Sequence, residues 1–193
     1  MTLKFIIATH NKHKIDEFKR ILEPMGIEVG TDKLTEAEET GKTFIENAYI
    51  KAKSACDETG LPCVADDSGL CVDYLGGEPG IYSARYAPEG QRKKTILSKL
   101  KNIPLEQRGA HFVSSICCVF PNGDVIKAEG KCFGAIAFEP KGDSGFGYDP
   151  IFLVGEKTFA EMTGEEKDAI SHRGNSLKLF EQELIKYMKN GVN

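Results

Sequence analysis

Residues 62–74 read PCVADDSGLCVDY. Pro62 to Ala65 is an apolar run typical of a buried strand, and Leu70 to Tyr74 predicts a second short strand. Asp66-Asp67-Ser68-Gly69 stands between them, so we predict two adjacent carboxylates at the end of a buried strand. Such a pair is costly unless a cation or hydrogen bonds offset the repulsion. Side chains of neighbouring strand residues point to opposite sides, so one aspartate of the pair is expected to face a site.

Two interpretations of these aspartates remain open from the residues alone. Carboxylate oxygens are the ligands that Mg²⁺ prefers, with water and substrate phosphates completing the coordination shell. Alternatively, Asp-Ser-Gly forms an Asx-turn that caps the strand end.

A strand-loop-helix pattern opens the chain. Leu3 to Ala8 predicts a first strand, Thr9 to Lys14 a polar loop, and Ile15 to Met25 a helix with apolar residues at helical spacing. Such a junction points backbone N–H groups and a positive helix end at an anion. Thr9, Asn11 and Lys14 add donors and charge, which suits a phosphate. A capped helix start with solvated lysines explains the same residues.

A capping box, Thr43 with Glu46, predicts a helix that ends at about Thr59. Asn47 and Lys51 lie one turn apart on one face of this helix. Just before it, Glu38-Glu39 could supply a further metal ligand beside Asp67, although a solvated acidic loop is the simpler interpretation.

The later chain favours hairpins. Residues 110–120 and 125–138 predict antiparallel strands around a Pro-Asn-Gly-Asp turn, and residues 174–189 predict the last helix. Helices and strands alternate early and hairpins follow, so the fold class is α/β with a mixed sheet. A length of 193 residues favours one domain, residues 1–193.

Composition excludes several classes of protein. A net charge of −4 opposes binding of long nucleic acid, which needs a basic stripe. No apolar run approaches 18 residues and the N-terminus has no signal-peptide layout, so we expect no membrane partner and a cytoplasmic location. The six cysteines lack zinc-site spacing and are expected to be reduced and structural.

A second polar region lies near the C-terminus: Gly145-Phe146-Gly147-Tyr148-Asp149-Pro150, then Ser171-His172-Arg173-Gly174. An aromatic ring between glycines, a carboxylate and an arginine can hold a flat polar ligand. A tight glycine turn and a surface His-Arg pair are the simpler alternatives. Together with the phosphate loop and the aspartates, this region favours hydrolysis of a magnesium nucleotide.

Five motifs, in order along the chain, resemble the inosine triphosphate pyrophosphatase family. They are ATHNKHK (8–14), AEETGKTFIENAYIKA (37–52), LPCVADDSGLCVDYLGGEPGIYSARYA (61–87), GFGYDPIF (145–152) and EEKDAISHRGNSLK (165–178). The resemblance implies Mg²⁺-dependent hydrolysis of ITP, dITP and XTP to the monophosphate and pyrophosphate. It also implies an elongated two-lobed α/β fold around a long mixed sheet with flanking helices, a substrate cleft between the lobes, and a homodimer.

The same resemblance implies roles for individual residues. Thr9, Asn11 and Lys14 match the phosphate loop, and Lys51 matches a lysine on the triphosphate side. Asp67 matches a metal ligand and the proton acceptor, Glu38 a second metal ligand with Glu39 leaving the register open, and Ser68 a substrate contact. The nucleoside pocket is matched by Phe146, Gly147, Tyr148, Asp149, Lys167, His172 and Arg173.

Two competing functions keep part of this chemistry. A related pyrophosphatase for modified pyrimidine nucleotides would change the base, and the SHRG and GFGYDP segments argue against it. A non-catalytic nucleotide sensor would bind without turnover, and the set of Asp66, Asp67, Glu38 and Lys14 argues for catalysis.

Overall fold

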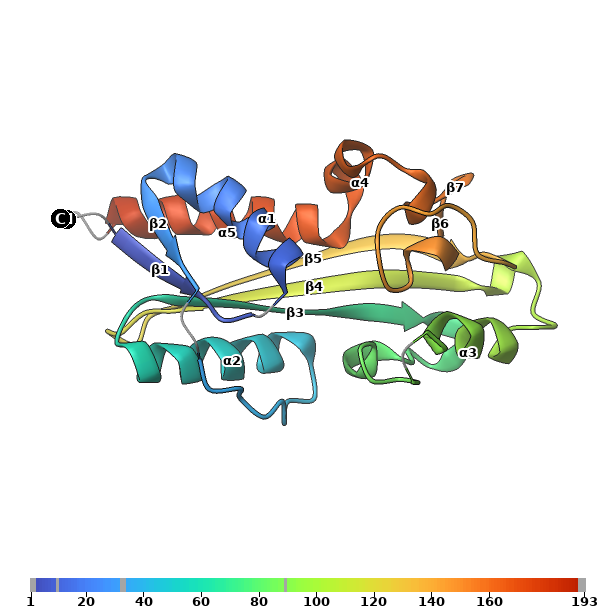
Figure 1. Cartoon of the computed structure of the whole chain (residues 1–193), viewed down its shortest axis with the longest axis horizontal. Helices are drawn as coiled ribbons and strands as arrows, with labels where there is room; N and C mark the ends of the chain where they lie inside the picture. Colours follow the sequence, from blue (N-terminus) through green and yellow to red (C-terminus); the bar gives the residue numbers. More distant parts are fainter. Residues whose placement is uncertain (1–2, 10, 32–33, 89, 191–193) are drawn as a thin grey trace. The chain divides into compact units, whose positions relative to one another are not determined.

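A computed structural model of the chain describes residues 3–9, 11–31, 34–88 and 90–190, without the side chains of His13 and Glu17. Strands and helices alternate along the first half, and strands dominate the middle (Figure 1). The strands are β1 (Leu3–Ile7), β2 (Ile27–Gly30), β3 (Cys63–Val72), β4 (Gly109–Val119), β5 (Val125–Ile136), β6 (Phe152–Val154) and β7 (Lys157–Thr158). The helices are α1 (Lys12–Leu22), α2 (Phe44–Thr59), α3 (Arg92–Lys99), α4 (Gly164–Ile170) and α5 (His172–Asn190).

The seven strands form one mixed sheet in the order β2-β1-β3-β4-β5-β6-β7. β1 pairs in parallel with both β2 and β3, whereas β6 pairs antiparallel with β5 and β7. The five residues that join β4 to β5 are too few for a crossover, so these neighbours run antiparallel. The α/β class with a mixed sheet is thereby confirmed.

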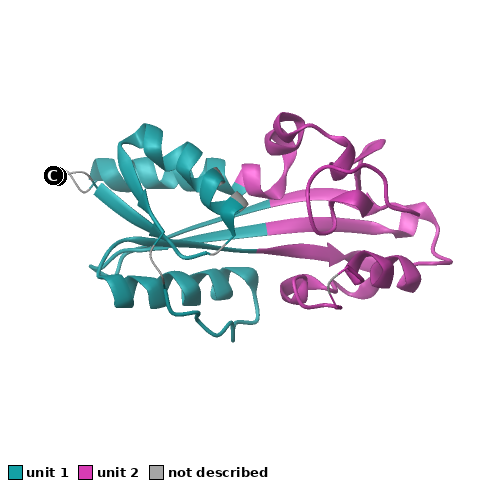
Figure 2. Ribbon diagram, viewed as in Figure 1, with its two compact units in different colours: residues 1–67, 114–130, 176–193 teal, residues 68–113, 131–175 magenta. Residues whose placement is uncertain are grey.

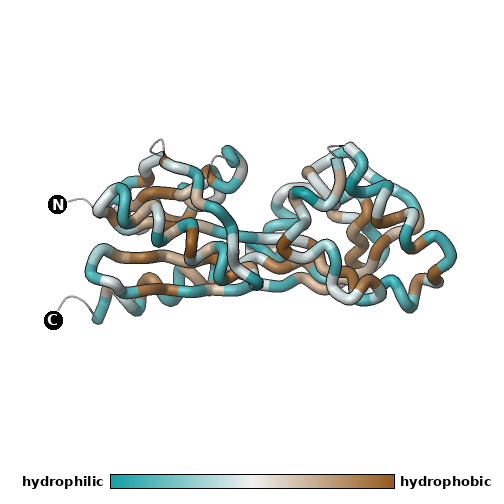
Figure 3. The backbone as a smooth tube through the Cα atoms, turned by 90° about the horizontal axis from the view of Figure 1, so that it is seen from below, coloured by the Kyte–Doolittle hydropathy of each residue, from teal (hydrophilic) through white to brown (hydrophobic). Residues whose placement is uncertain are grey.

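The chain divides into two compact units (Figure 2). Unit 1 comprises residues 1–67, 114–130 and 176–193, and unit 2 comprises residues 68–113 and 131–175. Strands β3, β4 and β5 and helix α5 have residues in both units. Hydrophobic residues follow the strands and the inner helix faces of each unit, and hydrophilic residues gather in the connections (Figure 3).

Unit 1 buries both faces of its strands. Phe5 and Ile7 of β1 pack with Phe18 of α1 and Phe180 of α5, while Ile6 between them packs toward α2. Helix α2 presents a narrow face of three buried alanines, Ala48, Ala52 and Ala55. Small side chains let this helix approach the sheet closely, so α2 covers one face while α1 and α5 cover the other (Figure 1).

The observed bounds of α2 match the predicted ones, whereas α1 and α5 begin earlier than predicted. Thr43 and Glu46 form the capping box of α2, and the helix ends at Gly60, whose φ of 68° is left-handed. The loop predicted for Thr9 to Lys14 is shorter than expected, because α1 begins at Lys12. Likewise α5 begins at His172 rather than at Gly174, so the His-Arg pair opens the helix.

The largest difference lies in residues 62–74. The two predicted short strands form one ten-residue strand, β3, and Asp66 and Asp67 lie inside it rather than at its end. The charged pair does not interrupt the strand because lysine and asparagine side chains from the neighbouring helices contact both carboxylates. No disulfide joins any of the six cysteines, all of which lie in the described ranges, and burial raises the pKa of Cys117 to about 11.

Unit 2 is built on three packed rings and one buried arginine. The rings of Phe112, Phe152 and Phe159 lie 4.6 to 5.9 Å apart. Arg108 is 1% exposed. Its guanidinium donates to the carbonyls of Leu100 at 2.6 Å, Ile136 at 2.7 Å and Ala137 at 2.7 Å. One side chain thus joins the end of α3 to the end of β5, and burial lowers its pKa.

Arg108→Ala should lower the free energy of unfolding by about 3 kcal/mol, or about 10 °C in Tm, because it leaves several buried carbonyls without donors. Thermal unfolding followed by circular dichroism measures this. Lys94→Ala, on the exposed side of α3, is the control and should stay within about 0.5 kcal/mol. Equal Tm values for the two variants would contradict the structural role of Arg108.

Candidate active site

Asp66 and Asp67 occupy the middle of β3, where they are 3% and 9% exposed. Adjacent strand residues face opposite sides, and the two carboxylates contact different helices. Asp66 Oδ2 lies 2.9 Å from Lys14 Nζ of α1. Asp67 contacts Asn47 and Lys51 of α2. The sheet therefore carries one carboxylate on each face.

The start of α1 shows the local structure expected of a helix cap. Thr9 Oγ1 accepts from the backbone N–H of Asn11 at 3.2 Å, and Asn11 Oδ1 lies 3.5 Å from the backbone nitrogen of Lys14. Thr9, Asn11 and Lys14 are each half-buried. The sequence therefore places a capped helix start and an ion-paired lysine next to Asp66, which is a suitable position for an anion-binding loop.

Two side chains of α2 contact the carboxylate of Asp67. Asn47 Nδ2 donates to Asp67 Oδ2 at 3.2 Å, and Lys51 Nζ lies 3.4 Å from Asp67 Oδ1. Lys51 Nζ also donates to Glu39 Oε1 at 2.8 Å. Glu39, Lys51 and Asp67 thus form a short chain of alternating charge on one face of α2.

The two oppositely charged groups at the centre of this chain have shifted pKa values. Burial raises the pKa of Asp67, Lys51 and Asn47 oppose that rise, and Glu39 adds to it. For Lys51, burial lowers the pKa, but the nearby carboxylates of Asp67 and Glu39 outweigh it and the net pKa is raised. Asp67 is therefore a stronger base than an exposed aspartate, and Lys51 remains charged.

The structure distinguishes the two neighbouring glutamates. Glu39 is half-buried and forms the ion pair with Lys51, whereas the side chain of Glu38 is exposed. Within the described part of the chain, Glu38 has no such ion pair. The role of Glu38 as a metal ligand stays a prediction. Glu39 is the glutamate that is connected to Asp67, because Lys51 contacts both carboxylates.

A second polar cluster lies in unit 2 around Asp149, which is 3% exposed. Its Oδ2 accepts from the backbone N–H of Phe146 at 2.8 Å and from Lys167 Nζ at 2.7 Å. Gly145 makes this turn possible: its φ is +74°, and a Cβ atom there would lie 2.2 Å from Asp149 Oδ2. Asp149 therefore holds the loop that presents Phe146.

Phe146 is 45% exposed and has two cations above its ring. Lys167 Nζ lies 5.0 Å and Arg173 Cζ 5.9 Å from the ring centroid. An exposed ring next to basic groups is a suitable surface for stacking a flat, polar, electron-rich ligand.

His172 and Arg173 are buried at the first turn of α5. The His172 ring stacks on Phe112 with centroids 4.6 Å apart and planes 13° apart. Arg173 donates from Nη2 to Ser68 Oγ at 3.2 Å. Contacts within unit 2 thus connect five of the predicted residues: Ser68, Phe146, Asp149, Lys167 and Arg173. A common nucleoside pocket stays a prediction.

Tyr148 differs in orientation from its neighbours in the predicted pocket. It is 5% exposed, its hydroxyl donates to the carbonyl of Ser83 at 2.9 Å, and burial raises its pKa to about 12. Tyr148 therefore anchors the loop through its side chain, while Gly147 next to it has φ +60° and open space around it. A nucleotide-binding role for either residue stays a prediction.

The sequence placed Asn47 on the same helix face as Lys51 but gave it no role in the site. In the structure it is fully buried and hydrogen-bonded to Asp67. Phe112, the stacking partner of His172, had no signal in the sequence beyond its place in a strand.

The carboxylates fit a hard cation. On the face of the sheet covered by α2, Asp67 supplies carboxylate oxygens of the kind that Mg²⁺ prefers, and Glu39 contacts the same lysine as Asp67. Among the described residues no group of three His, Cys, Asp or Glu side chains is gathered at metal-binding distance. Mg²⁺ sites in general use one or two carboxylates and take the remaining ligands from water and substrate phosphates.

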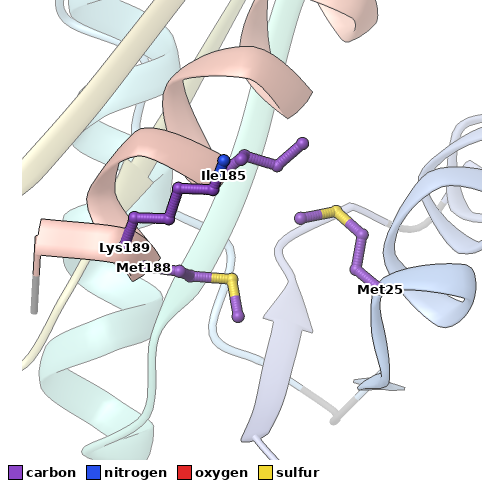
Figure 4. A pocket seen from close by; sticks show the side chains of 4 residues that line it. All are labelled: Met25, Ile185, Met188 and Lys189. Atoms are coloured by element: carbon purple, nitrogen blue, oxygen red, sulfur yellow. The ribbon is translucent and has the colours of Figure 1, made fainter. Parts of the chain in front are cut away.

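Two other hollows lie away from these clusters. One, of about 540 Å³ in unit 1, is lined by Met25 and by Ile185, Met188 and Lys189 of α5, and Met25 faces the α5 side chains across an open gap (Figure 4). The other, of about 580 Å³ in unit 2, is lined by residues of and around α3 and by Pro140. Neither includes a predicted site residue. Within the described ranges, no helix is both long and apolar enough to cross a bilayer.

The chain is similar to known proteins along most of its length. Residues 5–183 match the model of the Ham1 family. A dITP/XTP pyrophosphatase of Bacillus licheniformis is 48% identical, covering 90% of this chain and 93% of the relative. One from Haemophilus influenzae is 46% identical, covering 95% of this chain and all of the relative.

Solved structures agree. The Ham1 protein of Staphylococcus aureus has a TM-score of 0.87 at 39% identity, covering 95% of this chain and 99% of that one. A HAM1 protein from Coxiella burnetii has a TM-score of 0.89 at 38% identity, with the same coverage. The chain therefore belongs to the Ham1 family.

Proposed function

We propose that this protein hydrolyses the non-standard purine nucleotides ITP, dITP and XTP to the nucleoside monophosphate and pyrophosphate. The observation that carries the proposal is the carboxylate of Asp67: buried, raised in pKa and contacted by Lys51. Relatives 46% to 48% identical are named dITP/XTP pyrophosphatases, which supports the same reaction here.

We assign the triphosphate to the residues of unit 1. The capped start of α1 offers backbone N–H groups and the positive end of the helix, and Thr9, Asn11 and Lys14 lie there. Lys51 supplies a second positive charge. These groups neutralise negative charge on the phosphates, which grows on the leaving pyrophosphate as its bond breaks.

Asp67 serves as the proton acceptor in this proposal. Water adds to phosphorus, the anhydride bond between the α- and β-phosphates breaks, and Asp67 takes a proton of the water. Glu38 and Asp67 are the carboxylates that we assign to Mg²⁺, with Glu39 as the alternative to Glu38. When bound, Mg²⁺ supplies charge neutralisation and orientation of the phosphates.

The base is assigned to the residues around Asp149. Phe146, held by the turn around Asp149, stacks on the purine ring beside Lys167, with Gly147 and Tyr148 completing the loop. His172 and Arg173 supply hydrogen-bond donors for the 6-keto oxygen, and Ser68 is bonded to Arg173. ATP carries an amino donor at this position, so donors would face donors and ATP is disfavoured.

We further propose a cytoplasmic homodimer. The resemblance to the family supports it, and Phe133 and Phe138, 71% and 62% exposed, are aromatic residues of a kind enriched in interfaces. Sedimentation equilibrium of the full chain measures the oligomeric state.

Incubation with dITP and Mg²⁺ should release pyrophosphate, with dATP, dGTP and modified pyrimidine triphosphates turned over far more slowly. Identification of the product by ion chromatography is the test. Orthophosphate in place of pyrophosphate contradicts the assigned bond. Preference for a pyrimidine supports the alternative base, and metal-dependent binding without product supports a nucleotide sensor.

Asp67→Asn should lower kcat by several orders of magnitude while raising stability in metal-free protein at pH 7. The folded pKa of Asp67 is raised, so the native state loses stability as pH rises from the unfolded pKa through the folded one. The asparagine variant escapes this loss, and its advantage in Tm should vanish below the unfolded pKa, about 3.9. A constant difference in Tm across this range would contradict the raised pKa.

Phe146→Ala should raise KM for dITP about tenfold, because it removes the stacking surface, with a smaller change in kcat. Steady-state kinetics measure both constants. Phe146→Trp keeps an aromatic face and should stay close to wild type, and Tyr74→Ala, an exposed residue without an assigned role, is the control. An unchanged KM in Phe146→Ala removes this residue from the base pocket.

A further inference from the structure

Asn47 is a fully buried polar side chain that connects two segments carrying carboxylates. Its Oδ1 accepts from the backbone N–H of Gly41 at 2.9 Å, and its Nδ2 donates to Asp67 Oδ2 at 3.2 Å. Gly41 is the last residue of segment 35–41, which contains Glu38 and Glu39 and is called the acidic segment below. One amide group therefore spans from that segment to β3.

The partners determine which way the amide points. A backbone N–H faces one side and a carboxylate faces the other, so the reversed orientation would set donor against donor and acceptor against acceptor. Both ends of the amide are used at once. An aspartate at this position would keep the acceptor for Gly41 but lose the donor to Asp67.

The contact with Gly41 is closely packed. A Cβ atom at Gly41 would lie 2.6 Å from Asn47 Oδ1 and 2.7 Å from Glu46 Cβ. A side chain at Gly41 would displace Asn47 or the start of α2, so the backbone at Gly41 lies directly against the Asn47 amide.

The helix beneath Asn47 is held at its own start. The Thr43 side chain accepts from the backbone N–H of Glu46, and Glu46 Oε2 accepts from the backbone N–H groups of Lys42 and Thr43. One turn later, Lys51 contacts the other oxygen of Asp67 and also Glu39. One face of α2 thus restrains both oxygens of Asp67 and two points of the acidic segment.

We propose that Asn47 is a positioning residue for the reaction: it fixes the carboxylate of Asp67 relative to the acidic segment before metal and substrate bind. This inference rests on the proposed function for its kinetic consequence and on the geometry of unit 1 for its structural one. Restraint of a base and of nearby ligands in one arrangement lowers the cost of reaching the reactive geometry.

The first test compares Asn47→Ala with Thr43→Ala. Both changes remove a contact at the start of α2, but Thr43 does not touch Asp67. At a temperature at which both variants are folded, kcat of Asn47→Ala should fall at least thirtyfold with KM for dITP changed less than threefold. Thr43→Ala should keep kcat within twofold of wild type. Equal losses in the two variants would show a purely structural role and overturn the proposal.

Asn47→Asp is a second variant that tests the proposal if Asn47→Ala does not fold. It preserves the shape and the acceptor for Gly41, but it places a second carboxylate beside that of Asp67, and such a pair can share a proton. The loss of kcat should therefore be measured as the pH is raised to about 9, where the new carboxylate is ionised and cannot donate to Asp67. A folded Asn47→Asp variant that keeps the wild-type kcat up to that pH would overturn the proposal.

A readout without turnover separates this inference from the proposed function. Calorimetric titration with Mn²⁺ alone should show about tenfold weaker binding in Asn47→Ala and unchanged binding in Thr43→Ala. In metal-free protein, the amide hydrogen of Gly41 should exchange faster in Asn47→Ala. If wild type hydrolyses no purine triphosphate, the proposed function fails, and these two measurements still decide the role of Asn47. Unchanged metal affinity and exchange would overturn it.

Discussion

Two adjacent buried carboxylates in the middle of a strand are the constraint on which the rest of this structure depends. Asp66 and Asp67 sit where apolar side chains normally fill a sheet, and neither could remain ionised there without partners. Lys14 comes from the helix on one face, and Lys51 and Asn47 come from the helix on the other. The two helices therefore pack on the sheet of unit 1 through contacts that also offset the charges of β3. The same contacts stabilise the fold and form the candidate site.

In unit 2, a buried carboxylate again organises the local structure, here by fixing a turn. Asp149 receives the Phe146 backbone and the Lys167 ammonium group, which leaves the Phe146 ring outward on a fixed turn. The hydrogen bond from the Tyr148 hydroxyl to the Ser83 carbonyl holds that turn through its buried side. The stacking of His172 on Phe112 holds the start of α5. The exposed ring is thus supported by buried groups that need not touch a ligand themselves.

Local patterns in the sequence predicted most of the elements, and contacts between distant segments account for what was missed. The capping box at Thr43 and the turn after Phe120 are encoded within a few residues, and both were found. The continuity of β3 was not, because the side chains that offset its charges lie up to about fifty residues away. Tyr148 was grouped with its neighbours by motif, although its ring points inward to Ser83. Glu39 could not be separated from Glu38 without the position of Lys51.

The ion pairs around β3 also determine what an incoming anion has to displace. Lys14 is paired with Asp66, and Lys51 is shared between Glu39 and Asp67, so both ammonium groups already have carboxylate partners. A bare polyphosphate has to compete with these carboxylates for the lysines. In the proposed reaction, a polyphosphate that arrives with a divalent cation offers the carboxylates a new partner in exchange. We therefore expect these charges to favour one form of the same nucleotide over the other before any contact with its base.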